Sequence, residues 1–205
     1  MTTNNAVNVG LSGATGTGNF VGSNSPAIVT PNLGTPSAIN LTNATALPAS
    51  ALPSGAMFNF QQTQVTTASS VSNPTTMTDL GISVAITPTS ASNKVLVRAV
   101  LALGSDTTNL LGLQLVRGST PIGIATSVST RLAAGVNAYT GLASNILGVV
   151  LEWLDSPATT SSTTYKVQVQ NNGAGNAYLN RSSTDTDSNV FFRNVSVISV
   201  CEVHA

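Results

Sequence analysis

The sequence predicts an all-β protein, in which an extended N-terminal segment is followed by an antiparallel, jelly-roll-like β-sandwich. Three observations lead to this fold class. Apolar residues recur with a period of two in several stretches after residue 56, as they do in strands. Clusters of Gly, Asn, Ser and Pro separate these stretches, as turns do. The resulting set of about eight short strands, with no convincing helical periodicity between them, suits a two-sheet sandwich over residues 56–205.

Residues 1–55 are expected to form an extended attachment segment. They hold seven of the 17 glycines and five of the nine prolines, and the first charged residue of the chain is Asp79. Each proline removes a backbone donor and favours an extended conformation in the residue before it. A flexible linker is the alternative interpretation. The segment carries apolar side chains that we expect to anchor it on a partner: Phe20, Val21, Ile28, Val29, Leu33, Ile39 and Leu41.

The strands of residues 56–205 are predicted from their alternation. Val95, Val97 and Ala99 alternate with Leu96 and Arg98, for example, which is the side-chain period of a strand. The Asn-Asn-Gly-Ala-Gly sequence at 171–175 is a turn between two further strands. Residues 130–145 are the exception, and are expected to hold a short helix or a long loop. The predicted strands cover residues 58–65, 80–87, 95–103, 111–115, 122–124, 146–154, 165–169, 177–179 and 195–203.

Several of these strands are apolar on both faces. Leu96, Val100 and Ala102 share the face opposite Val95, where a strand with one solvated face would carry polar residues. We therefore expect some outer faces to be buried between the subunits of a homo-oligomer.

The chain carries few charges, with seven Lys or Arg and seven Asp or Glu among 205 residues and a net charge of zero. This balance argues against nucleic-acid binding, which depends on basic side chains that neutralise phosphates. No apolar run approaches the ~20 residues that span a bilayer, and the N-terminus lacks the basic start of a secretory signal. Cys201 is the only cysteine, which excludes an intramolecular disulfide. We therefore expect that the protein does not insert into a membrane. We also expect that it is synthesised in a reducing cytoplasm.

The candidates for catalysis are few, and we assign no catalytic residue, cofactor or metal. His204 is the only histidine and is expected in a frayed, solvated terminus. Glu152 with Asp155, or Asp185 with Asp187, could supply the two carboxylates of a glycosidase, although a turn cap and an edge charge are the expected roles of the first pair. Asp185 and Asp187 begin like a calcium loop without its glycine and distal glutamate. A polar loop is the expected structure there, and a hard-ion site is the alternative.

Four further features have simple explanations. The glycine-rich run at 10–18 lacks the Lys-Ser/Thr ending of a phosphate-binding loop. Cys201 alternates with valines and is expected to be a small buried residue. Asn-x-Ser/Thr triplets, expected to stay unmodified, begin at Asn40, Asn43, Asn180 and Asn194. The chain has one tryptophan and three tyrosines, which are expected to pack in the core or at an interface, and the alternative is that they form a sugar-binding surface: Trp153, Tyr139, Tyr165 and Tyr178.

The stretch GLSGATGTGNFVGSNSPAIVTPNLGTPSAINLTNATALP, from Gly10 to Pro48, resembles a segment of the fibre proteins of tailed bacteriophages. The similar blocks are Val-Gly-Ser, Ser-Pro, Val-Thr-Pro, Leu-Gly-Thr-Pro and Leu-Thr-Asn-Ala-Thr. Shorter blocks at 115–123 and 154–166 also resemble phage structural domains. The resemblance implies a homotrimeric virion component whose N-terminal segment attaches to the particle and whose C-terminal domain projects from it. It supplies no catalytic residue.

We therefore interpret the chain as a non-enzymatic tail fibre or tail-associated appendage of a virion, assembled in the cytoplasm of a bacterial host. Its expected partners are two further copies of itself and other virion proteins, with host attachment through a surface glycan as a further role. A capsid decoration protein, such as a head fibre or cement protein, is the alternative. A glycan-binding or glycan-cleaving tailspike is a more distant one.

Overall fold

The computed structural model describes residues 49–106 and 110–205, and these residues form an all-β fold, as predicted. They belong to a unit that spans Ala46–Ala205. The glycine-rich run at 10–18 lies outside the described residues. So do all of the predicted anchor residues: Phe20, Val21, Ile28, Val29, Leu33, Ile39 and Leu41.

Nine of the described strands correspond to the predicted ranges, and the two strands at 69–71 and 136–139 were not predicted. Within the described residues the only helical segment is a 3-10 turn, η2 (Ala49–Ala51). Of the two structures expected over 130–145, the helix is absent and the loop is interrupted by strand β7, whose short Val-Asn-Ala-Tyr run pairs with the edge of β5. The strands are β1 (Met57–Val65), β2 (Ser69–Val71), β3 (Thr78–Ile86), β4 (Lys94–Ser105), β5 (Leu110–Arg117), β6 (Thr120–Ile122), β7 (Val136–Tyr139), β8 (Leu147–Asp155), β9 (Thr163–Asn171), β10 (Ala177–Leu179) and β11 (Ser196–Val203).

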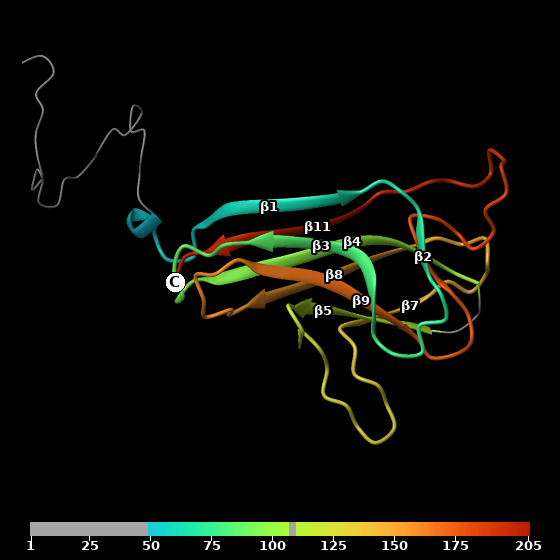
Figure 1. Ribbon diagram of the computed structural model, residues 1–205, viewed down its shortest axis with the longest axis horizontal. Helices are drawn as coiled ribbons and strands as arrows, with labels where there is room; N and C mark the ends of the chain where they lie inside the picture. Colours follow the sequence, from blue (N-terminus) through green and yellow to red (C-terminus); the bar gives the residue numbers. More distant parts are fainter. Residues whose placement is uncertain (1–48, 107–109) are drawn as a thin grey trace, which may run out of the picture. The chain divides into compact units, whose positions relative to one another are not determined.

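These strands form two antiparallel sheets (Figure 1). In sheet A the order is β1-β11-β4-β10-β2, and β8 pairs with the other edge of β4. Strand β4 is long enough to hold two partners end to end on one edge, with β11 along Lys94–Val100 and β10 along Leu103–Ser105. In sheet B the order is β3-β9-β5-β6, and β7 pairs with β5 beside β6.

One apolar core lies between the inner faces of the two sheets, which gives the fold its sandwich-like character. Val95, Val97 and Ala99 on β4 point into this core, whereas Arg98 and Val100 on the same strand are exposed. This is the alternation predicted from the sequence. Sheet B contributes Tyr165, which is the largest fully buried side chain, and the alternate residues of β3, β5 and β9.

Both ends of the described chain are tied to the same end of the sandwich. The Gly55 amide donates to the His204 carbonyl at 2.8 Å, and the His204 amide donates to the Ala56 carbonyl at 2.9 Å. The His204 ring lies 6.4 Å from the Phe58 ring. The expectation that His204 is frayed and solvated is therefore wrong, because pairing beside β1 fixes its backbone. The loop between β10 and β11 lies at the opposite end (Figure 1).

Asn180 fills the gap between β10 and β11 along β4. Its backbone φ of 65° is in the left-handed region, which asparagine tolerates better than most residues. Its side-chain amide donates to the carbonyls of Val65 (2.7 Å) and Thr67 (3.0 Å), and its Oδ1 accepts from the Ser196 hydroxyl at 2.6 Å. Its backbone amide donates to the Ala102 carbonyl. One buried side chain thus closes the sheet where two strands meet.

Glu202 is a second buried polar residue, with no exposed surface. Its Oε1 accepts from the Thr89 amide and hydroxyl, both at 2.8 Å, and from Asn93 Nδ2 at 2.7 Å. Its Oε2 accepts from Asn59 Nδ2 at 2.9 Å. Burial alone would raise the pKa of this carboxyl, but these hydrogen bonds outweigh burial and hold the pKa below its ordinary value.

Candidate functional site

The outer face of sheet B carries a polar, internally paired ladder beside an exposed apolar pair, Leu110 and Tyr139. Asp79 accepts from Lys166 Nζ at 2.7 Å and from Gln168 Nε2 at 2.8 Å, and Gln168 in turn accepts from Gln114 Nε2 at 2.9 Å. The hydrogen bond from Lys166, followed by that from Gln168, lowers the pKa of Asp79. This side-chain ladder crosses three strands, and the part of the face that it covers suits solvent.

On the outer face of sheet A, a continuous set of apolar side chains lies across three strands, β8, β4 and β11. Val100 on β4 is paired with Val150 on β8, and they are 42% and 48% exposed. Leu96 is paired in the same way with Leu154, which is 44% exposed. Val197 on β11 adjoins Val100 from the other side. We call these five residues the apolar face of sheet A.

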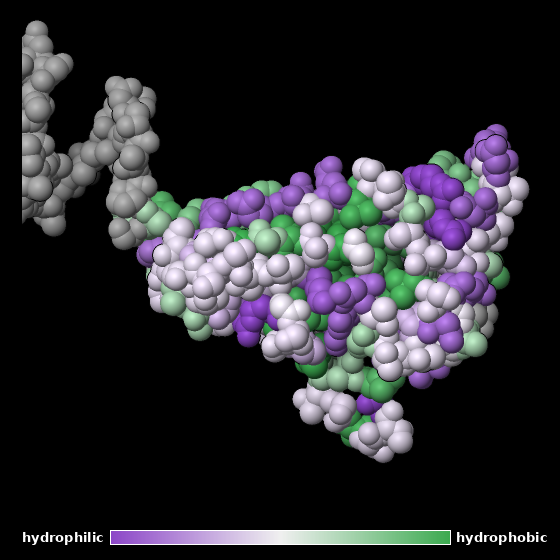
Figure 2. Space-filling view, viewed as in Figure 1, coloured by the Kyte–Doolittle hydropathy of each residue, from purple (hydrophilic) through white to green (hydrophobic). Residues whose placement is uncertain are grey.

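A single ion pair crosses the apolar face of sheet A. Arg98 and Glu152 are cross-strand partners with a 3.8 Å separation between Nε and Oε2, and each side chain is more than half exposed. An exposed pair of this kind contributes little to stability. It does, however, leave the face without net charge. The space-filling view shows hydrophobic residues reaching the surface in patches between hydrophilic ones (Figure 2).

The apolar face of sheet A continues into a groove beneath the loop between β10 and β11. The groove has a volume of about 370 Å³. Its floor includes Ala102 and Gly148, which are cross-strand partners next to the Val100–Val150 pair. Its walls include Ile146 and Phe191. The exposed apolar surface of sheet A therefore extends from the middle of the sheet toward this loop.

Glu152 and Asp155, the first carboxylate pair considered for glycosidase chemistry, do not face a common space. Glu152 and Asp155 are three residues apart on β8 and thus point to opposite faces. Asp155 is buried and accepts from Arg117 Nη1 through both oxygens, at 2.9 and 2.8 Å, and from the Tyr165 hydroxyl at 2.8 Å. Burial, and then the hydrogen bond to Asp155, raise the pKa of Tyr165. The cluster ties β5, β8 and β9 together, which is a structural role.

Asp185 and Asp187 share the loop between β10 and β11, but Asp185 forms ion pairs with two arginine side chains. It lies 2.6 Å from Arg193 Nη1 and 3.5 Å from Arg181 Nη1. Arg181 also stacks over the Tyr178 ring, with its guanidinium carbon 4.1 Å from the ring centroid. No group of three or more metal-ligating side chains occurs in the part of the chain that the structure describes. The polar loop is therefore the interpretation that the ion pairs favour.

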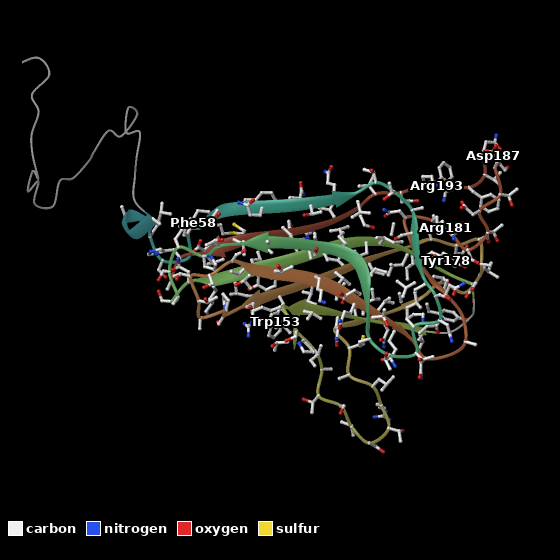
Figure 3. All side chains as sticks on the ribbon, in the orientation of Figure 1. Phe58, Trp153, Tyr178, Arg181, Asp187 and Arg193 are labelled. Atoms are coloured by element: carbon white, nitrogen blue, oxygen red, sulfur yellow. The ribbon has the colours of Figure 1, made fainter. Side chains whose placement is uncertain are left out.

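The four aromatic residues considered for sugar binding do not gather on one surface. Tyr165 and Tyr178 are buried, whereas Tyr139 and Trp153 are about half exposed. Trp153 covers Gly123, where an added Cβ would lie 3.0 Å from the indole Cδ2. Figure 3 shows Trp153 well separated from Tyr178. Packing accounts for three of them, and Tyr139 remains as an exposed ring on sheet B.

The sequence reasoning missed a cavity on the outer face of sheet B. It has a volume of about 490 Å³ and lies between β5, β9 and the loop that joins β6 to β7. Arg131 lines it together with Asn137 and Asn172. Only the isolated arginine in a loop of small residues could have signalled this site, because the cavity depends on where that loop lies beside the sheet.

Cys201 is buried, as expected. Its Sγ donates to the Phe58 carbonyl at 3.2 Å, and burial raises the pKa of the thiol. In the Asn-x-Ser/Thr triplet that begins at Asn180, the Asn and Ser side chains are buried as well. In residues 49–106 and 110–205, no helix is long and apolar enough to cross a membrane. No protein-family model matches the sequence, and no curated protein is significantly similar to it.

Proposed function

We propose that the protein is a non-enzymatic structural component of a tailed-bacteriophage virion, whose C-terminal domain is a jelly-roll head that associates into a homotrimer. The exposed apolar face of sheet A is the observation that carries the proposal. The resemblance of residues 10–48 to phage fibre proteins supports the virion and the number of subunits. A tail fibre or tail-associated appendage is the primary assignment.

The strand order supports a jelly roll. Such a fold places eight strands in two four-stranded sheets, and its first and last strands are neighbours. Here β1-β11-β4-β8 form one set of four. Strand β10 follows β11 along the same edge of β4, and β2 pairs with β10 as β1 pairs with β11. The order β3-β9-β5 forms the other, with β6 and β7 sharing the fourth position. Jelly rolls supply rigid domains for assembly, because loops at their ends vary without disturbing the sheets.

The apolar face of sheet A supports association through this surface. Val100, Val150 and Leu154 keep nearly half of their surface in water, and burying the remainder in an interface would contribute about 1 kcal/mol for each side chain. The ion pair between Arg98 and Glu152 is already neutral as a unit, so its burial brings no net charge into the interface. Sheet B, with its paired polar ladder, would face solvent.

The N-terminal segment would attach the domain to the particle. In our proposal it adds strand hydrogen bonds to a virion protein and inserts its apolar side chains, as in β-augmentation. The pairing of Gly55 and Ala56 with His204 supports a fixed starting point for this segment at one end of the sandwich. That leaves the loop between β10 and β11 at the far end, where a projecting domain meets its surroundings (Figure 1).

Light scattering on the purified full-length chain tests the trimer. We expect a mass of three times the 20.7 kDa chain for the wild type. Val150→Glu would place an unpaired charge in the interface and dissociate it, since a buried unpaired charge costs several kcal/mol. Val128→Glu is the matched control, because Val128 is an exposed valine of a loop away from sheet A. A wild-type monomer, or equal effects of the two variants, would contradict the proposal.

Copy number distinguishes the tail from the capsid. A stained gel of purified virions, calibrated against a protein of known stoichiometry, should show a few trimers for each particle if the protein is a tail fibre. Dozens of trimers or more would instead indicate the capsid decoration protein. Virions lacking the gene would also lose adsorption to the host in the first case and particle stability in the second.

A further inference from the structure

The cavity above sheet B has the size and the form of a small-molecule site. Its volume of about 490 Å³ falls in the range of roughly 300–1,000 Å³ that ligand pockets occupy. Gly112 of β5 lies at its base, where an added Cβ would sit 3.7 Å from both Ala134 Cβ and Met77 Cε. The loop from residue 123 to 135, drawn in yellow in Figure 1, forms one wall. The absence of a side chain at Gly112 leaves space between the strand and residues 130–134 of this loop.

Arg131 gives this cavity a positive charge, and no carboxylate of the described residues forms an ion pair with it. The other four arginines of the chain each lie within 3.8 Å of a carboxylate oxygen: Arg98, Arg117, Arg181 and Arg193. Arg131 has no such partner among residues 49–106 and 110–205, and the rest of the sequence contains no Asp or Glu. A guanidinium presents forked donors that match a carboxylate in a bidentate pair.

The other polar groups of the cavity are uncharged amides. Asn137 and Asn172 each offer a donor and an acceptor. Gln170 donates its Nε2 to the Thr75 carbonyl at 2.7 Å, which fixes the amide and directs its oxygen as an acceptor. Converging amides of this kind are suited to the hydroxyl groups of a ligand, which both donate and accept.

Apolar groups complete the lining. Met77, Leu110 and Leu132 line the cavity beside the amides. Tyr139, which is 54% exposed, is the cross-strand partner of Leu110 and lies on the same face of sheet B. A pyranose ring has this combination of surfaces, with hydroxyl groups at its rim and an apolar face of C–H groups that packs on aliphatic and aromatic side chains.

We propose that this cavity binds a carboxylated sugar, that is, a uronic or sialic acid unit of a glycan. Arg131 pairs with the carboxylate, the three amides bind hydroxyl groups, and the leucines and Met77 pack against the ring. The inference does not depend on the virion assignment or on the trimer, because every group that it uses belongs to one chain and lies on the opposite sheet from the proposed interface.

Calorimetric titration of the full-length protein tests this site. The probes are N-acetylneuraminic acid and glucuronic acid, with N-acetylglucosamine, glucose and acetate as comparisons. We expect at least one acidic sugar to bind with a dissociation constant of about 1 mM or tighter, and the neutral sugars and acetate at least about tenfold more weakly. Raising the salt concentration should weaken the binding of the acidic sugar, because salt screens the ion pair between its carboxylate and Arg131.

Three variants locate the binding. Arg131→Gln should reduce the affinity for the acidic sugar to that of the neutral one, whereas Lys94→Gln, which removes an exposed positive charge at the start of β4, should leave it unchanged. Gly112→Val should abolish binding by filling the floor, and valine suits a strand.

The proposal is overturned if no acidic sugar binds at about 10 mM, well above the expected constant. It is also overturned if acetate or the neutral sugars bind as tightly, or if Arg131→Gln and Gly112→Val both bind like the wild type. Light scattering of the same samples reports the oligomeric state separately, so a failed trimer and a failed sugar site give different results.

Discussion

Replacing Asn180 should destabilise the domain more than almost any other polar substitution, because this residue closes the gap between two strands. Asn180→Ala removes three side-chain hydrogen bonds, to Val65, Thr67 and Ser196. At about 1 kcal/mol for each bond, their loss costs roughly 3 kcal/mol. Alanine in the left-handed region, at a φ of 65°, adds about 1 kcal/mol more. The total of about 4 kcal/mol is a large part of the roughly 5–15 kcal/mol that typically stabilises a domain.

Asn180→Gly separates the two contributions. Glycine adopts the left-handed conformation freely, so it should lose the hydrogen bonds without the backbone penalty and be about 1 kcal/mol less destabilised than alanine. Urea unfolding followed by the fluorescence of Trp153, the only tryptophan, measures both variants. All samples must have the same protein concentration, since association adds to apparent stability.

The control for Asn180 is Asn172→Ala, an exposed asparagine of the turn before Gly173, which should change stability by less than about 0.5 kcal/mol. A loss below about 1 kcal/mol for Asn180→Ala would refute the hydrogen-bond reasoning. Equal losses for the glycine and alanine variants would refute the backbone part of the argument.

Three further predictions concern the buried charges and one close contact. Because the pKa of Glu202 is lowered in the fold, its ionised carboxylate contributes fully to the free energy of unfolding above pH 4.5, the ordinary pKa. This contribution is lost as the pH falls through the lowered pKa, so Glu202→Gln should flatten the acid limb of a stability–pH curve. Gly123→Ala, at a φ of 60° and with its Cβ 3.0 Å from Trp153, should cost about 2 kcal/mol and shift the tryptophan emission. Arg117→Gln should cost about 3 kcal/mol by leaving the buried carboxylate of Asp155 without its cation, as urea unfolding would measure.

Each of these has a comparison that isolates its cause. Arg98→Gln removes an arginine from an exposed ion pair and should cost no more than about 0.5 kcal/mol, so a loss as large as that of Arg117→Gln would contradict the role of burial. Gly118→Ala shares the positive φ of Gly123 with nothing near its Cβ, so equal effects would exclude the contact with Trp153. If the acid limb is unchanged in Glu202→Gln, the loss of stability in acid comes from other carboxylates.

The sequence predicted the strands well because their cause is local. The alternation from Val95 to Leu103 records which side chains of β4 are buried, and the same pattern located β1, β3, β8 and β11. Strands β2 and β7 were missed because three and four residues are too few for a period, and the pairing of β7 with β5 depends on the preceding loop.

The candidate sites were harder to predict, because they depend on pairing across long sequence separations. Glu152 and Asp155 are close in sequence but point to opposite faces, and Asp155 is held by Arg117 from another sheet. Arg131 drew no attention in the sequence, since its significance lies in the cavity and in the pairing of the other arginines. By contrast, the two-sided apolar pattern at Leu96 and Val100 correctly located an exposed apolar surface, since face assignment follows directly from strand periodicity.

The pairing of β1 with β11 has a consequence for how the protein is made. The first strand of the domain finds its hydrogen-bonding partner in the last, with Met57 opposite Val203, and β11 also covers the edge of β4. During synthesis, sheet A therefore cannot close until the residues of β11 have left the ribosome. Until then β1 and β4 present unpaired edges to every neighbouring nascent chain. A chain that stops before Ser196 would lack the strand that joins β1 to β4, so it should leave both edges unpaired for good.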